Sequence, residues 1–117
     1  MKTILIVEDT ELNVDLLTQL LEDDYNLLVA KDGVQGVSMA QKEKPDLIIM
    51  DISLPVMDGY EATRTIRQTL PSIPIIGLSA HAMSGDEQKA REAGCNDYLT
   101  KPVDEDLLIQ KLKENLG

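Results

Sequence analysis

The chain has 117 residues, which suits one domain and leaves little room for a second. Its 21 acidic and 11 basic residues give a net charge of −10, which excludes a general affinity for nucleic acids or anionic membranes. The single cysteine, Cys95, excludes an internal disulfide, and no segment approaches the length of a membrane span. We therefore expect one cytoplasmic domain over residues 1–117, with no further domain attached.

Short apolar segments alternate with helix-like segments along the whole chain. Strands are expected, in chain order, at residues 4–7, 27–30, 47–50, 75–78 and, with a weaker pattern, 98–100. The first and third are apolar at every position, which is typical of strands that are covered on both faces. Strands that alternate with helices predict an α/β fold, with a parallel sheet and helices on both sides.

The segments between the strands carry helical signals. Apolar residues recur at helical spacing at Val14, Leu17 and Leu21, and again at Ile109, Leu112 and Leu116. Candidate N-caps are Thr10, Asp104 and Ser84, the last with capping-box spacing to Glu87, and Gly94 is a candidate helix end.

Candidate functional residues follow four of the five expected strands. Glu8 and Asp9 follow the first, Asp51 the third, Ser79 and Ala80 the fourth, and Lys101 the fifth. In open parallel sheets, ligands bind outside the carboxyl ends of the strands. We therefore expect these residues to form one site at that edge of the sheet.

Three of these residues are acids that would converge without compensating charge. Carboxylates at close range either take up protons or bind a cation. Oxygen ligands favour a hard divalent ion, and Mg²⁺ needs only one or two carboxylates together with water, whereas zinc and copper favour other ligands. Glu8, Asp9 and Asp51 thus predict a magnesium site.

The remaining residues at the carboxyl edge of the sheet can bind an anion. A hydroxyl at Ser79 and an ammonium at Lys101 can bind a phosphoryl group, and the small Ala80 leaves space for its oxygens. Asp51 can be the nucleophile, because carboxylates form aspartyl phosphates. Each residue alone also has an ordinary explanation, as a helix cap, a turn residue or a strand-end hydroxyl. Their joint position at successive strand ends favours the functional interpretation.

Four motifs carry a family resemblance. They are LIVED at 5–9, DLIIMDISLPVMDGYE at 46–61, PIIGLSAHA at 74–82 and AGCNDYLTKPV at 93–103. With these motifs the chain resembles the receiver domain of two-component response regulators over essentially its whole length. The resemblance implies a flavodoxin-like doubly wound sheet of five parallel strands in the order 2-1-3-4-5.

The resemblance also implies roles for individual residues. Asp51 would be phosphorylated, with Mg²⁺ held by Glu8, Asp9, Asp51 and the backbone carbonyl of Ser53. The phosphoryl-binding and switch residues would be Ser79, Ala80, Lys101 and Tyr98, and the Lys101–Pro102 bond would be cis.

Three positions depart from the usual family pattern. Glu8 stands where many relatives have Asp, Ser79 replaces the common Thr, and Thr10 replaces a frequent Asn. None of these changes removes a required chemical group. His81 is expected to line the mouth of the site and not to bind metal.

The implied function is a phosphorylation switch and not a turnover enzyme. The donor would be a histidine kinase or a histidine phosphotransfer protein, and the output would be a protein target, with no nucleic acid or membrane. The output surface would comprise the fourth helix, fifth strand and fifth helix, in a monomer or weak dimer.

Three other classes of protein compete with this interpretation. A dehalogenase-type phosphatase would need a second Asp where Ser53 stands, and a flavin-binding domain would be expected to carry Trp or Phe, which the chain lacks. A receiver-like binding module that acts without phosphorylation is the remaining alternative. Such modules usually lose the Asp, the acidic pair or the Lys that this chain keeps.

Overall fold

The computed structural model describes residues 1–54, 56–80 and 86–116. Over these residues strands and helices alternate strictly, as the sequence pattern predicts. In chain order the elements are β1 (Thr3–Val7), α1 (Glu11–Leu21), β2 (Asn26–Ala30), α2 (Gly33–Glu43), β3 (Leu47–Asp51), α3 (Gly59–Thr69), β4 (Ile75–Ser79), α4 (Asp86–Ala93), β5 (Asp97–Thr100) and α5 (Glu105–Leu116). Each expected strand is present and is one residue longer than expected.

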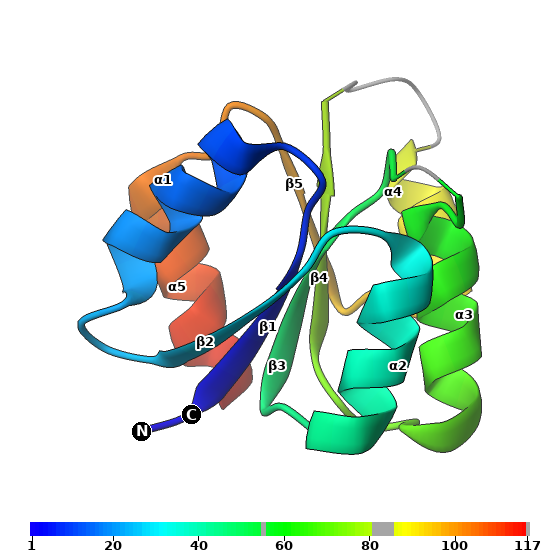
Figure 1. Ribbon diagram of the computed structural model, residues 1–117. Coiled ribbons are helices and arrows are strands. Elements are labelled where there is room, and N and C mark those ends of the chain that lie inside the picture. The colour runs from blue at the N-terminus through cyan, green and yellow to red at the C-terminus, as the bar shows by residue number, and fades with distance from the viewer. Residues whose placement is uncertain (55, 81–85, 117) are drawn as a thin grey trace.

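The strands form one parallel sheet in the order β2-β1-β3-β4-β5, which confirms the flavodoxin-like fold. Helices α1 and α5 cover one face, and α2, α3 and α4 cover the other (Figure 1). The chain order reverses between β1 and β3, and such a reversal opens a crevice at the carboxyl ends of the two strands. Both strands deliver acids to this crevice.

The core consists of aliphatic side chains on both faces of the sheet. Strands β3 and β4 are buried at every position and β1 at four of five, because helices cover both of their faces. Leu17 and Leu21 of α1 pack onto one face, as expected. The buried face predicted for α5 was wrong in part. Leu108 and Leu112 are buried, whereas Ile109 is only half-buried.

The helix ends test the predicted caps. Asp104 Oδ1 accepts a hydrogen bond from the Leu107 N–H at 3.1 Å, and Gly94 ends α4 with a φ of +121°. Thr10 takes the N-cap position of α1, but its side chain makes no capping hydrogen bond there. Ser84 and His81 lie outside the described residues. Within the described part of the chain, every helix is too short or too polar to cross a membrane.

Candidate functional site

The carboxyl edge of the sheet brings the expected site residues together. Glu8 comes directly after β1, Asp51 and Ser79 end β3 and β4, and Lys101 comes directly after β5. The carboxylates of Glu8, Asp9 and Asp51 each offer an oxygen, and these oxygens lie within 4.8 Å of one another. Glu8 and Asp51 are only 1% and 3% exposed, whereas Asp9 is exposed.

This cluster fits the metal that the sequence predicts. Its donors are all carboxylate oxygens, which hard cations such as Mg²⁺ prefer. One of the three carboxylates reaches solvent, so a bound ion could keep water ligands on that side.

Lys101 supplies positive charge to the two buried acids. Its Nζ lies 2.8 Å from Glu8 Oε2 and 3.4 Å from Asp51 Oδ2. Burial alone would lower the pKa of this ammonium, but the hydrogen bond to Glu8 and the charges of Asp51 and Glu8 outweigh burial and raise the pKa. Lys101 therefore carries a full charge that is shared between the strand ends of β1 and β3.

Asp51 titrates far from its ordinary range. Burial and the negative charge of Glu8 raise the pKa of this carboxyl to about 6, although the Ser53 N–H and Lys101 act in the opposite direction. Its Oδ1 accepts a hydrogen bond from the Ser53 N–H at 3.0 Å. Near neutral pH, Asp51 is thus a buried carboxylate, with one oxygen held by backbone and the other facing Lys101.

A glycine fixes the loop that carries this geometry. A side chain at Gly59 would overlap the Asp51 carbonyl oxygen and lie 2.7 Å from Ile52 Cα. The Gly59 N–H donates to the Ile52 carbonyl at 2.9 Å, so the loop after β3 folds back onto Asp51. The sequence marks Gly59 as a turn residue, and the close approach of its backbone to Asp51 appears only in the structure.

A family model for the response regulator receiver domain matches residues 4–113. The chain belongs to this family.

Curated relatives and solved structures agree with this assignment. The polar-differentiation response regulator DivK of Brucella anthropi is 39% identical, over 99% of this chain and 97% of its own. The receiver domain of the sensor histidine kinase PA1611 from Pseudomonas aeruginosa PAO1 superposes with a TM-score of 0.92 at 39% identity. The match covers 99% of this chain and 98% of that one. That structure has a magnesium ion coordinated in its active site cleft.

A receiver domain protein (CheY-like) from Methanospirillum hungatei JF-1 gives a TM-score of 0.93 at 31% identity, over 99% of this chain and 94% of that one. Together with the carboxylate cluster of this chain, these relatives make Mg²⁺ the cofactor of this receiver domain.

The remaining expected residues of the receiver differ in burial. Ser79 is buried, and its carbonyl accepts a hydrogen bond from the Lys101 N–H at 2.7 Å. Ala80 and Ser53 are exposed, and Tyr98 is half-buried against the core on the α2–α4 side. The Lys101–Pro102 bond is cis, as expected from the family.

Two contacts of Glu8 could not be read from the sequence. Its Oε1 accepts from the Thr10 N–H at 3.3 Å, and its Oε2 accepts from Lys101. The longer side chain of Glu8, compared with the family's usual Asp, is thus held at both oxygens by groups of this chain.

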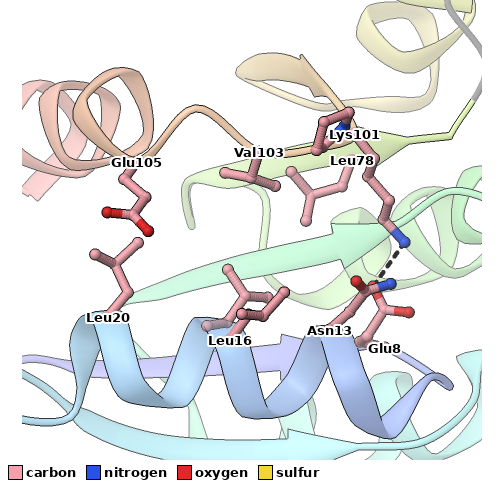
Figure 2. A pocket seen from close by; sticks show the side chains of 10 residues that line it. Glu8, Asn13, Leu16, Leu20, Leu78, Lys101, Val103 and Glu105 are labelled. Atoms are coloured by element: carbon pink, nitrogen blue, oxygen red, sulfur yellow. Dashed lines mark hydrogen bonds and ion pairs between the residues drawn. The ribbon is translucent and has the colours of Figure 1, made fainter.

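A cavity of about 130 Å³ lies beside the site, between α1 and the segment that follows β5. Figure 2 shows the Lys101–Glu8 ion pair near Asn13, and Leu16, Leu20 and Val103 along the rest of the cavity wall. The carboxyl edge of the sheet therefore continues into an apolar hollow along α1.

Proposed function

We propose that this receiver is a phosphorylation switch in which Asp51 accepts a phosphoryl group from a phosphohistidine of a histidine kinase or phosphotransfer protein. The observation that supports this most directly is the buried Asp51 carboxylate, grouped with Glu8 and Asp9 and 3.4 Å from Lys101. The switch belongs to one receiver domain in the cytoplasm, and its output is contact with a protein target.

The chemistry follows from the two oxygens of Asp51. Oδ1 is held by the Ser53 N–H, and we assign Oδ2 as the nucleophile because it faces Lys101. Oδ2 attacks phosphorus, an oxygen–phosphorus bond forms, and the phosphorus–nitrogen bond breaks with its electron pair returning to the donor imidazole. Lys101 then stabilises the phosphoryl oxygens that arrive beside it.

Magnesium and the switch residues complete this proposal. Glu8, Asp9, Asp51 and the Ser53 carbonyl would hold the ion, which when bound supplies positive charge to the phosphoryl oxygens. Ser79 and Ala80 would contact the phosphoryl group, and movement of Ser79 and Tyr98 would change the α4–β5–α5 surface that a target protein binds. The receiver would act as a monomer or weak dimer.

The assignment of Asp51 can be tested by intact mass after incubation with acetyl phosphate and Mg²⁺. We expect one phosphoryl adduct on the wild type and none on Asp51→Asn. Asp97→Asn, which changes an acid at the far end of β5, should keep the adduct. An adduct that persists in Asp51→Asn would disprove the assignment, and no adduct on the wild type with any donor would favour the binding module that acts without phosphorylation.

We further propose that the donor protein docks on α1. Leu12 and Leu16 are 66% and 56% exposed on this helix, which begins three residues after Glu8. Exposed apolar side chains beside a phosphoryl-accepting site suit a protein partner better than a small donor. The cavity behind Leu16 offers such a partner a recess in the same surface.

This docking surface predicts a split between two kinds of donor. Leu16→Ser should slow transfer from a phosphorylated histidine phosphotransfer protein about tenfold through loss of apolar contact. The rate with acetyl phosphate should stay unchanged. Val34→Ser is the matched control, because Val34 is also exposed but lies on α2 across the sheet (Figure 1). Equal slowing by both substitutions would contradict docking on α1.

A further inference from the structure

The segment that joins α4 to β5, residues 94–97, lies at the amino edge of the sheet, at the opposite end of β5 from Lys101. We call it the α4–β5 segment. Its backbone is tied to two neighbouring elements, because the Cys95 N–H donates to the Ala90 carbonyl at 2.9 Å and the Asn96 N–H donates to the Ile75 carbonyl at 2.8 Å. The segment therefore connects α4 to the start of β4.

Arg67, in the last turn of α3, binds this segment through most of its guanidinium group. Nε and Nη2 donate to the Gly94 carbonyl at 3.0 and 2.8 Å, and Nη2 also donates to Asn96 Oδ1 at 2.7 Å. Nη1 donates to the Leu70 carbonyl at 3.0 Å, which fixes the guanidinium to the end of its own helix. One arginine thus joins the C-terminal ends of α3 and α4.

Glycine at position 94 makes this contact possible. Its φ of +121° disfavours other residues, and any side chain there would lie 2.7 Å from Arg67 Cγ. Asn96 Oδ1 in turn accepts from the Ile75 N–H at 2.9 Å, so the same amide oxygen links Arg67 to β4.

Charged residues of α4 and α5 add to the same connection. Arg91 Nη1 donates to the Asn96 carbonyl at 3.0 Å. Asp97 lies 3.3 Å from Lys111 Nζ and accepts from Asn115 Nδ2 at 3.1 Å. The α4–β5 segment is therefore bonded from α3, α4, α5 and β4.

The side chains that the structure describes in α4, residues 87–93, differ in burial along the helix. Among these residues, Ala90 and Ala93 in the C-terminal half are buried, whereas Glu87, Gln88 and Lys89 nearer the start are exposed. The start of α4 follows β4, which ends at Ser79 beside the phosphorylation site. The secured end is thus remote from Asp51, and the exposed end follows the strand that reaches the site.

We propose that Arg67 is a positioning residue that fixes the C-terminal end of α4, so that α4 pivots about the α4–β5 segment when the receiver is switched. The pivot rests on the proposed phosphorylation of Asp51 for its trigger. The anchoring by Arg67 is a property of the resting protein and holds without phosphorylation. The buried side chains of α4 near the anchored end, Ala90 and Ala93, are small, so a change in the angle of the helix would displace little core volume.

Amide hydrogen exchange of the unphosphorylated protein tests the anchoring. Arg67→Lys keeps the charge but loses the forked geometry that reaches Gly94, Leu70 and Asn96 together. We expect exchange at residues 94–97 to become about tenfold faster in this variant, with β1 and β3 unchanged. Arg64→Lys, an exposed position one turn earlier on α3, should leave exchange unchanged. Exchange at 94–97 that is equal in Arg67→Lys and wild type would overturn the proposal.

The same measurement with acetyl phosphate and Mg²⁺ tests the pivot. In the wild type we expect altered exchange at the start of α4 and none at 94–97, and in Arg67→Lys the change should extend to 94–97 at an unchanged phosphorylation rate. A wild-type change that is uniform along α4 overturns the pivot. If the wild type takes up no phosphoryl group, the function proposed for Asp51 fails, and exchange in the resting protein still decides the anchoring. If Arg67→Lys does not fold, Asn96→Ala removes one of the Arg67 bonds together with the bond from the Ile75 N–H, and exchange at 94–97 should again become faster.

Discussion

The carboxyl and amino edges of the sheet both pair acids with lysines, but they differ in how the charges are balanced. At the carboxyl edge, Glu8 and Asp51 are buried with one ammonium, Lys101, between them and the exposed Asp9 beside them. At the amino edge, Asp97 has both Lys111 and Asn115 within bonding distance. Buried carboxylates outnumber the one lysine between them at the first edge, whereas Asp97 at the second edge is matched by its neighbours.

This difference in charge balance distinguishes the edge of the receiver that binds a cation from the edge that stabilises the fold. An excess of buried negative charge is unfavourable for the isolated chain, and a bound cation relieves it. Matched polar contacts at the amino edge, such as those of Asp97, stabilise the fold. The same sheet thus carries a metal-binding edge and a fixed edge, and substitutions at each edge compare them directly.

The largest expected effect comes from removing the cation at each edge. Lys101→Met leaves Glu8 and Asp51 buried together without a positive neighbour, and should lower the free energy of unfolding by about 3 kcal/mol without magnesium. Lys111→Met removes a more exposed cation from Asp97 and should cost about 1 kcal/mol. Urea unfolding at pH 7.5 with a chelator measures both. Equal losses would mean that the two edges do not differ in charge balance.

Replacement of an acid by its amide should raise the free energy of unfolding at the carboxyl edge and lower it at the amino edge. The pKa of Asp51 in the folded protein, about 6, lies above its ordinary value of 3.8, so the folded state binds more protons than the unfolded state between these values. Ionisation of Asp51 therefore lowers stability as the pH rises, and the loss is complete above pH 6. Asp51→Asn should raise the free energy of unfolding by about 2 kcal/mol at pH 7.5 and by little at pH 4.

Asp97→Asn should instead lower the free energy of unfolding by about 1 kcal/mol at pH 7.5, because it removes the partner of Lys111. Denaturant titrations at both pH values, with a chelator present, compare the two variants.

Millimolar Mg²⁺ should stabilise the wild type, since the ion binds only the folded site. Destabilisation by Asp51→Asn, or no effect of magnesium on the wild type, would contradict the charge excess at the carboxyl edge.

The sequence was sufficient for features that depend on local pattern. Apolar runs and strand-end acids are visible in a single chain, and the rule for parallel sheets brings Glu8, Asp51 and Lys101 to one edge without any coordinates. The α/β fold and the acidic cluster could therefore be predicted from the residues themselves, whereas the order of the strands followed only from the resemblance to the receiver family.

Features that depend on packing could not be predicted in the same way. Lys101 binds Glu8 across 93 residues of chain, and its choice of partner depends on where β5 ends relative to β1. Arg67 reads as an ordinary polar residue of a helix, because its carbonyl partners appear only when α3 packs beside α4. Burial of Leu108 in place of Ile109 likewise reflects the rotation of α5 on the sheet, which a spacing of three or four residues leaves open.

The smallest effects concern one strained backbone position at each edge. Val56, in the loop after Asp51, has a φ of +68° and is 86% exposed, and Lys44, which ends α2 at the amino edge, has a φ of +47°. A β-branched residue is rare in this region, whereas a helix-ending residue in it is common. Glycine relieves the strain but adds freedom to the unfolded chain. Each change to glycine should therefore alter the free energy of unfolding by less than about 1 kcal/mol.

The rate of phosphorylation should distinguish Val56→Gly from Lys44→Gly, although their free energies of unfolding should be similar. Val56→Gly loosens the loop that folds back onto Asp51 through Gly59, and should change the rate of phosphorylation by acetyl phosphate about threefold. Lys44→Gly should leave that rate unchanged, because α2 ends at the opposite edge. Stopped-flow kinetics at matched stability gives the comparison. Equal rates in both variants would show that the strain at Val56 belongs to the fold alone and contributes nothing to the carboxyl edge.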